Sequence, residues 1–144
     1  MNLNFVRGTY WLGAIVDALA AVQLLLPTSR SLLGFPGLRA SGVAGQPAIM
    51  AAVLMLGWSV VLVWAHLRTR ERRAVLAITL GVVLALAVSN IAYGLSGSLP
   101  WAQLAAPLAI QAVLGTMFGL SIPIARRAAL ARARDSAATP AAGS

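Results

Sequence analysis

The chain of 144 residues is 60% hydrophobic and only 10% charged, and its mean hydropathy of +0.85 excludes an ordinary soluble domain. It contains no cysteine and one histidine, which excludes disulfides, thiol redox chemistry and a side-chain cage for a transition metal. The formal net charge of +8 comes from eleven arginines against three acidic residues, and these arginines gather at the ends of apolar stretches. We therefore predict an integral membrane protein that contacts anionic lipids, with no nucleic-acid partner, metal or cofactor.

Four apolar stretches follow one another along the chain. Each is close to or above the roughly 20 residues that a helix needs to cross the hydrocarbon core of a bilayer. The fold class that we predict is all-α, a bundle of four transmembrane helices with both termini in the cytoplasm. The predicted helices cover residues 9–26, 47–66, 74–95 and 101–125.

The segments that connect and follow these stretches differ in character. Residues 27–46 are interrupted by glycine and proline, which predicts a loop. "RTRERR" at 68–73 predicts a tight polar connection, and "SGSLP" at 96–100 an uncharged one. We predict that residues 1–127 form the transmembrane domain and that 128–144 form a cytoplasmic tail, basic and helical at first and then disordered.

The distribution of arginine predicts the orientation of the bundle. With the N-terminus inside, one arginine at position 7, four in 68–73 and four in 126–134 are cytoplasmic, and only Arg30 and Arg39 lie outside. We therefore expect a multi-pass protein of the cytoplasmic (inner) membrane of a prokaryote. A cleaved signal peptide is the competing interpretation, since Ala18 and Ala20 have A-x-A spacing, but the carboxylate within the apolar region counts against it.

Asp17 lies near the middle of the first apolar stretch and is the principal candidate for a functional residue. A carboxyl that faces hydrocarbon has no partner, so we expect its side chain to point into the bundle or into a water-filled cavity. Intramembrane carboxylates often mark ion, proton or substrate sites. The residues one turn before and after Asp17 are small, so another helix backbone can approach there. These small residues are Gly13, Ala14, Ala20 and Ala21.

Depth in the membrane selects the candidate partners of Asp17. At 1.5 Å per residue, Asp17 lies about 12 Å from the cytoplasmic boundary, a depth similar to that of Trp58 and Thr116. Gln111 lies up to two turns farther out. Gly115 and Gly119 follow it at four-residue spacing, a small-residue pattern typical of close contacts between helices. We therefore predict contact between the first and fourth helices. The candidate partners of Asp17 are then Gln111, Thr116 and the indole N–H of Trp58.

A second group of polar side chains lies nearer the predicted outer surface. Gln23 comes from the first helix, and Asn90 and Tyr93 come from the third at a comparable height. We expect them to extend a polar pocket from Asp17 outward. The alternative is that each only bonds a neighbouring helix, an interaction worth about 0.6 kcal/mol on average.

Two segments carry a resemblance. "YWLGAIVDALAAVQLLLP" at 10–27 and "GWSVVLVWAHLRTRERRAVL" at 57–76 resemble parts of small four-helix integral membrane proteins of prokaryotes whose function is not established. The resemblance implies a four-helix architecture and carries no function with it.

Three functions are compatible with these observations. We place first the binding or transport of a small lipophilic or protonatable ligand through an intramembrane pocket centred on Asp17. The second is an intramembrane enzyme of the cyclase, isomerase or epoxide-opening type, with Asp17 as general acid on an isoprenoid or lipid and Trp58, Trp64 or Tyr93 stabilising a cation. The third is a non-catalytic partner subunit, and assembly of several copies stays open. The predicted ligand-binding residues are Asp17, Gln23, Trp58, Asn90, Tyr93, Gln111 and Thr116.

Overall fold

The computed structural model describes residues 3–25, 45–69 and 71–138, and its regular secondary structure is helical throughout that part. Each helix is long and apolar enough to cross a membrane, so the prediction of an all-α chain with four such helices is confirmed. Most of the predicted loop 27–46 and the last residues of the predicted tail lie outside the described residues. The helices are α1 (Leu3–Leu25), α2 (Gly45–Leu67), α3 (Ala74–Leu95) and α4 (Trp101–Ala138).

Two helix ends extend well past the expected positions, while α2 exceeds its expected range of 47–66 by only one or two residues at each end. α1 begins at Leu3 rather than at residue 9, because Phe5 and Val6 already pack into the core of the bundle. α4 continues beyond residue 125 to Ala138, through a segment rich in alanine and arginine, which are both strong helix formers. The apolar part of α4 that could cross a membrane runs from Trp101 to Ala131.

The connection between α3 and α4 is short and closely packed. Gly97 has a φ of 71°, in the left-handed region that glycine adopts without steric cost. At Gly94 a Cβ atom would lie 2.8 Å from Cη2 of Trp101, so a larger residue would force the Trp101 ring to move. These two glycines allow α4 to fold back along α3.

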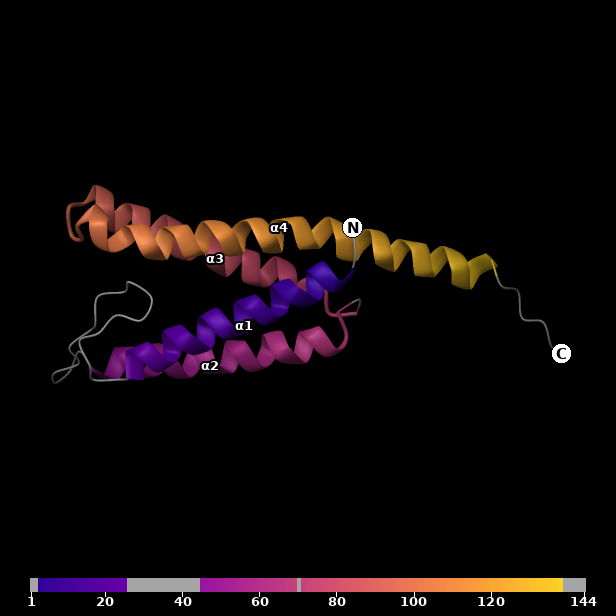
Figure 1. Cartoon of the computed structure of the whole chain (residues 1–144), viewed down its shortest axis with the longest axis horizontal. Helices are drawn as coiled ribbons and strands as arrows, with labels where there is room; N and C mark the ends of the chain where they lie inside the picture. Colours follow the sequence, from indigo (N-terminus) through magenta and orange to yellow (C-terminus); the bar gives the residue numbers. More distant parts are fainter. Residues whose placement is uncertain (1–2, 26–44, 70, 139–144) are drawn as a thin grey trace.

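The helices are arranged as two hairpins (Figure 1). α1 packs along α2, α3 packs along α4, and the two hairpins meet where α1 contacts α4. In Figure 1 the hairpins lie close together near the start of α1 and the α2–α3 connection, and they diverge toward the opposite end.

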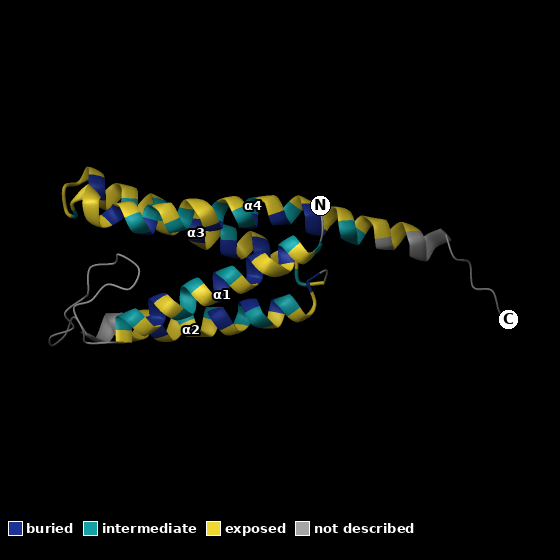
Figure 2. Ribbon diagram, viewed as in Figure 1, coloured by how far each residue is buried: buried dark blue, intermediate teal, exposed yellow. Residues whose placement is uncertain are grey.

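The core of the bundle lies where the hairpins meet. Tyr10 and Phe118 are fully buried there, and their rings pack edge to face with centroids 6.5 Å apart. Beside them the hydroxyls of Thr9 and Ser121 are hydrogen-bonded across α1 and α4 at 3.0 Å, and both residues are fully buried. The outward faces of the helices are exposed and apolar (yellow in Figure 2), as in Leu95 at 77% exposure, which suits a lipid environment.

The predicted contact between the first and fourth helices is confirmed, but the glycines of α4 do not make it. Gly13 of α1 provides the close approach, since a Cβ there would lie 3.0 Å from Cζ of Phe118. A Cβ at Gly115 would meet Val83 of α3 at 3.8 Å, and one at Gly119 would meet nothing within 4 Å. The small residue that matters is therefore on the helix that carries Asp17.

Candidate functional site

One cavity lies between the four helices on the side of the core where the hairpins begin to diverge. Its volume is about 80 Å³, and it is partly open. A cavity needs a volume of roughly 10 to 15 Å³ to hold one water molecule, so this cavity has room for a few waters or a small ligand. Its lining is formed by Gly13, Val16, Asp17, Ala20, Met55, Trp58, Thr79, Val82, Val83, Leu86, Pro107, Ile110, Gln111, Leu114 and Phe118.

Asp17 enters this cavity from α1 and is half-buried. Gly13 and Ala20, which lie one turn to either side of it, line the same cavity and leave space beside the carboxyl. Within the described part of the chain the carboxyl of Asp17 takes part in no hydrogen bond or ion pair. A carboxyl in this position needs a water molecule, a proton or a ligand to satisfy it.

Trp58 enters the same cavity from α2. Its indole Nε1 is buried and has no hydrogen-bond acceptor among the described residues. The direct bond to Asp17 that depth suggested is not formed. Within the described part of the chain, the indole N–H of Trp58 lacks an acceptor and the carboxyl of Asp17 lacks a donor. A bound molecule that supplied both would satisfy the two groups together.

Gln111 completes the polar lining from α4. Its Oε1 accepts a hydrogen bond from Nδ2 of Asn90 on α3, at 3.2 Å. This bond links the two helices of the second hairpin and orients the amide of Gln111, whose NH₂ group keeps its capacity to donate. Asn90 thus acts on the cavity through Gln111, although it does not line the cavity itself.

Three other predicted site residues lie away from the cavity. Thr116 is exposed and donates to the carbonyl of Ala112 at 2.8 Å. It is two residues from both Leu114 and Phe118, which places it on the opposite face of α4 because each residue turns a helix by about 100°. Depth alone could not distinguish these two faces.

Tyr93 and Gln23 lie too far along their helices to reach the cavity of Asp17. Tyr93 is 55% exposed and comes two turns after Leu86, the last cavity residue of α3. Gln23 is half-buried and lies about 9 Å along α1 from Asp17, beyond Ala20. The polar pocket that these residues were expected to extend therefore ends near Asp17 and Gln111.

Pro107 and Thr79 also line the cavity, although neither was among the predicted site residues. Pro107 is buried in the wall, and because proline lacks an N–H it leaves the carbonyl of Gln103 without its usual helical donor. Thr79 is buried and donates to the carbonyl of Val75 at 2.8 Å. A proline inside an apolar helical stretch is the one signal that could have indicated the position of Pro107.

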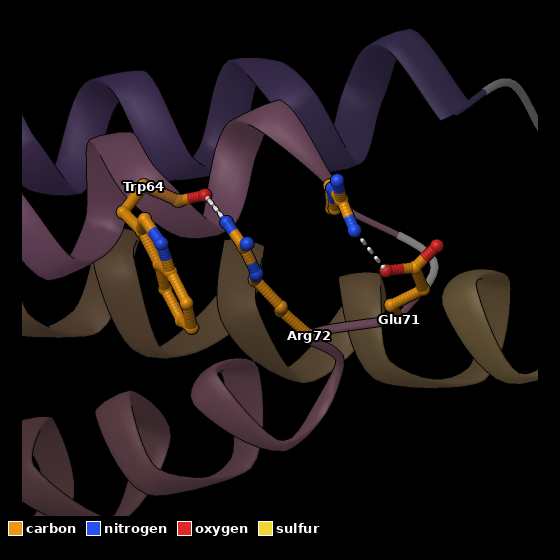
Figure 3. A network of polar contacts seen from close by, with 4 residues as sticks. Trp64, Glu71 and Arg72 are labelled. Carbon is orange, nitrogen blue, oxygen red and sulfur yellow. Dashed lines mark hydrogen bonds and ion pairs between the residues drawn. The ribbon is translucent and has the colours of Figure 1, made fainter.

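A second polar cluster joins α1 to the α2–α3 connection. The hydroxyl of Tyr10 donates to the carbonyl of Arg72 at 3.1 Å. The guanidinium of Arg72 lies 3.3 Å from the centroid of the Trp64 ring and donates to the Trp64 carbonyl, while Arg68 pairs with Glu71 at 3.4 Å (Figure 3). Trp64 is therefore occupied by Arg72 and lies outside the cavity of Asp17.

Within the described residues no three side chains of His, Cys, Asp or Glu come together in a group that could hold a metal ion. Comparison with protein-family models, with curated proteins and with solved structures finds no match for this chain. No relative therefore supports the resemblance to small prokaryotic four-helix proteins. The described residues form a bundle of four apolar helices around a small, mostly apolar cavity that contains Asp17.

Proposed function

We propose that this chain is a multi-pass membrane protein that binds a small protonatable or lipophilic ligand in the cavity of Asp17. One observation carries the proposal: the carboxyl of Asp17 and the indole N–H of Trp58 share a small cavity, and neither has a hydrogen-bond partner among the described residues. Unsatisfied polar groups inside a membrane bundle are costly, so their retention together favours a ligand that satisfies both.

The chemistry of the lining favours a small organic cation with a short apolar body. The carboxylate of Asp17 would pair with an ammonium group, and the face of the Trp58 ring adds a cation–π attraction. The amide NH₂ of Gln111 can donate to a hydroxyl or ether oxygen of the ligand. The remaining wall is apolar, with Leu86 and Leu114 among its residues, and would contact a short hydrocarbon chain.

The volume of the cavity favours binding over the enzyme alternative. Pockets that hold drug-sized ligands measure roughly 300 to 1,000 Å³, whereas this cavity measures about 80 Å³. An isoprenoid or lipid substrate would fit only after the hairpins had separated. The role of partner subunit is less favoured for a different reason: a structural carboxyl would be bonded to another helix, and among the described residues Asp17 has no such partner.

The arrangement in two hairpins supports transport as well as binding. The main contact between the hairpins is that of α1 with α4, so a hinge movement there would change access to the cavity. We further propose that both termini are cytoplasmic and that the protein resides in the inner membrane of a prokaryote, as the distribution of arginine indicates.

Fluorescence of Trp58 provides the test. In a full-length variant with Trp11, Trp64 and Trp101 changed to Phe, Trp58 is the remaining tryptophan and reports directly on the cavity. Titration with propylammonium chloride in detergent micelles should give a saturable change in emission. Asp17→Asn should abolish this change. Thr116→Val, on the opposite face of α4, should leave it intact and serves as the matched control.

The pH dependence of this titration tests the role of charge. A proton and an ammonium ion compete for the same carboxylate, so the affinity for propylammonium should rise with pH as Asp17 ionises and then level off. Propanol, which has no charge, should show no such dependence. Equal affinity of wild type and Asp17→Asn for propylammonium at every pH would rule out Asp17 as the anchor of the ligand.

A further inference from the structure

A second, larger concavity lies where the start of α1 crosses α4, away from the cavity of Asp17. It has a volume of about 490 Å³, within the range of sites that hold an organic ligand. We call it the α1–α4 groove. Its lining consists of Leu3, Leu120, Pro123, Ile124, Arg127 and Ala128.

The shape of the groove follows from the lengths of the two helices. The lining residues of α4 recur every three or four positions, so they form one face of that helix. α1 begins at Leu3, whereas α4 continues to Ala138. Because α4 extends past the start of α1, no described residue of another helix covers this face of α4 beyond Leu3.

The groove has an apolar floor and a basic side chain at one end. Ile124 is buried, while Leu120 is 47% exposed and Arg127 is exposed. Arg7, one turn after Leu3 on α1, is also exposed. The acidic residue of the α2–α3 connection, Glu71, is already paired with Arg68. A ligand with an apolar part and an anionic group complements this pattern.

The position of the groove along α4 indicates which class of ligand it binds. The part of α4 that could cross a membrane ends at Ala131, so the groove runs from within the apolar span to its basic end. We propose that it binds one anionic phospholipid, with an acyl chain along Leu120 and Ile124 and the phosphate at the guanidinium of Arg127. Arginine matches phosphate with two parallel hydrogen bonds, and free phosphate would leave the apolar part of the groove empty.

Native mass spectrometry of the full chain, extracted from vesicles of phosphatidylglycerol and phosphatidylcholine, tests this proposal. Wild type should retain one phosphatidylglycerol in preference to phosphatidylcholine. Arg127→Gln should lower this retention about fivefold, the effect of one arginine on an anionic lipid. Arg126→Gln removes the same charge from an exposed neighbour that does not line the groove, and it should retain the lipid.

Filling the groove gives a test that leaves charge unchanged. Ala128→Leu adds apolar bulk to the lining and should also lower retention of phosphatidylglycerol, with far-UV circular dichroism confirming that the helices remain. Equal losses in Arg126→Gln and Arg127→Gln would mean a diffuse attraction and would overturn the proposal. Unchanged retention in Arg127→Gln, or displacement of the lipid by inorganic phosphate, would overturn it as well.

Discussion

The polar groups of the core and those of the Asp17 cavity are neighbours in the bundle but differ in their hydrogen bonding. At the core, Thr9 is bonded to Ser121 and the hydroxyl of Tyr10 to the carbonyl of Arg72. In the cavity, the Asp17 carboxyl and the Trp58 indole have no partner among the described residues. The core is closed by large side chains, whereas the cavity keeps space between all four helices.

This contrast separates residues that hold the helices together from residues that are available to a ligand. Satisfied polar groups and tight packing lower the free energy of the bundle. Unsatisfied groups raise it, and natural proteins retain such groups chiefly at functional sites. Substitutions of core side chains, including Phe118, which also forms part of the cavity wall, should therefore reduce stability. Substitutions of the polar cavity residues should reduce binding while leaving or increasing stability.

The largest effect is expected at Phe118. Phe118→Ala removes a fully buried ring that packs against Tyr10 and Gly13, and it should lower the free energy of unfolding by about 3 kcal/mol. Unfolding in mixed micelles with increasing denaturing detergent, followed by far-UV circular dichroism, measures this change. Val113→Ala, at a position with 55% exposure on the same helix, is the control and should remain close to wild type.

Asp17→Leu should change the free energy of unfolding in the opposite direction. It replaces a polar side chain that has no partner among the described residues by an apolar one of similar size. The free energy of unfolding should therefore rise by about 1 to 2 kcal/mol while the response to propylammonium is lost. The same unfolding assay and the Trp58 titration give the two values. A loss of stability would show that the carboxyl is bonded in the native bundle and would argue against the division between core and cavity.

A pair of glycines tests how close the helices must be. Gly13→Ala places a methyl group about 3.0 Å from the buried ring of Phe118 and should cost about 1 kcal/mol through overpacking. Gly119→Ala meets nothing within 4 Å and should stabilise α4 slightly, by roughly 0.5 kcal/mol, because alanine favours the helix. Equal effects of the two substitutions would place the helix contact elsewhere.

The smallest effect is expected at the hydrogen bond of the core. Thr9→Val leaves the hydroxyl of Ser121 without its partner and should cost about 0.6 kcal/mol, the average for such bonds inside membranes. The double variant Thr9→Val, Ser121→Ala should be less unstable than the sum of the single variants. A double-mutant cycle in the unfolding assay measures this coupling, and strict additivity would mean that the bond contributes nothing.

Reasoning from the sequence located part of the candidate site. Depth brought Asp17 and Trp58 together, and the small-residue pattern of the fourth helix added Gln111; all three line the cavity. Thr116 has a suitable depth but lies on the opposite face of α4, and Tyr93 lies two turns beyond the cavity. Depth follows from counting residues along each helix, whereas the face that a helix turns toward its neighbours does not.

The sequence by itself determined the four helices, because a long apolar stretch satisfies its own backbone hydrogen bonds only as a helix when no water is available. It also predicted that Asp17 faces the interior of the bundle, and Asp17 lies half-buried in the cavity between the helices. Only the tertiary structure decided the pairing into two hairpins, the contact of Gly13 with Phe118 and the enclosure of Asp17 beside Trp58. These depend on the rotation of each helix about its axis, which is set by packing between residues far apart in the chain.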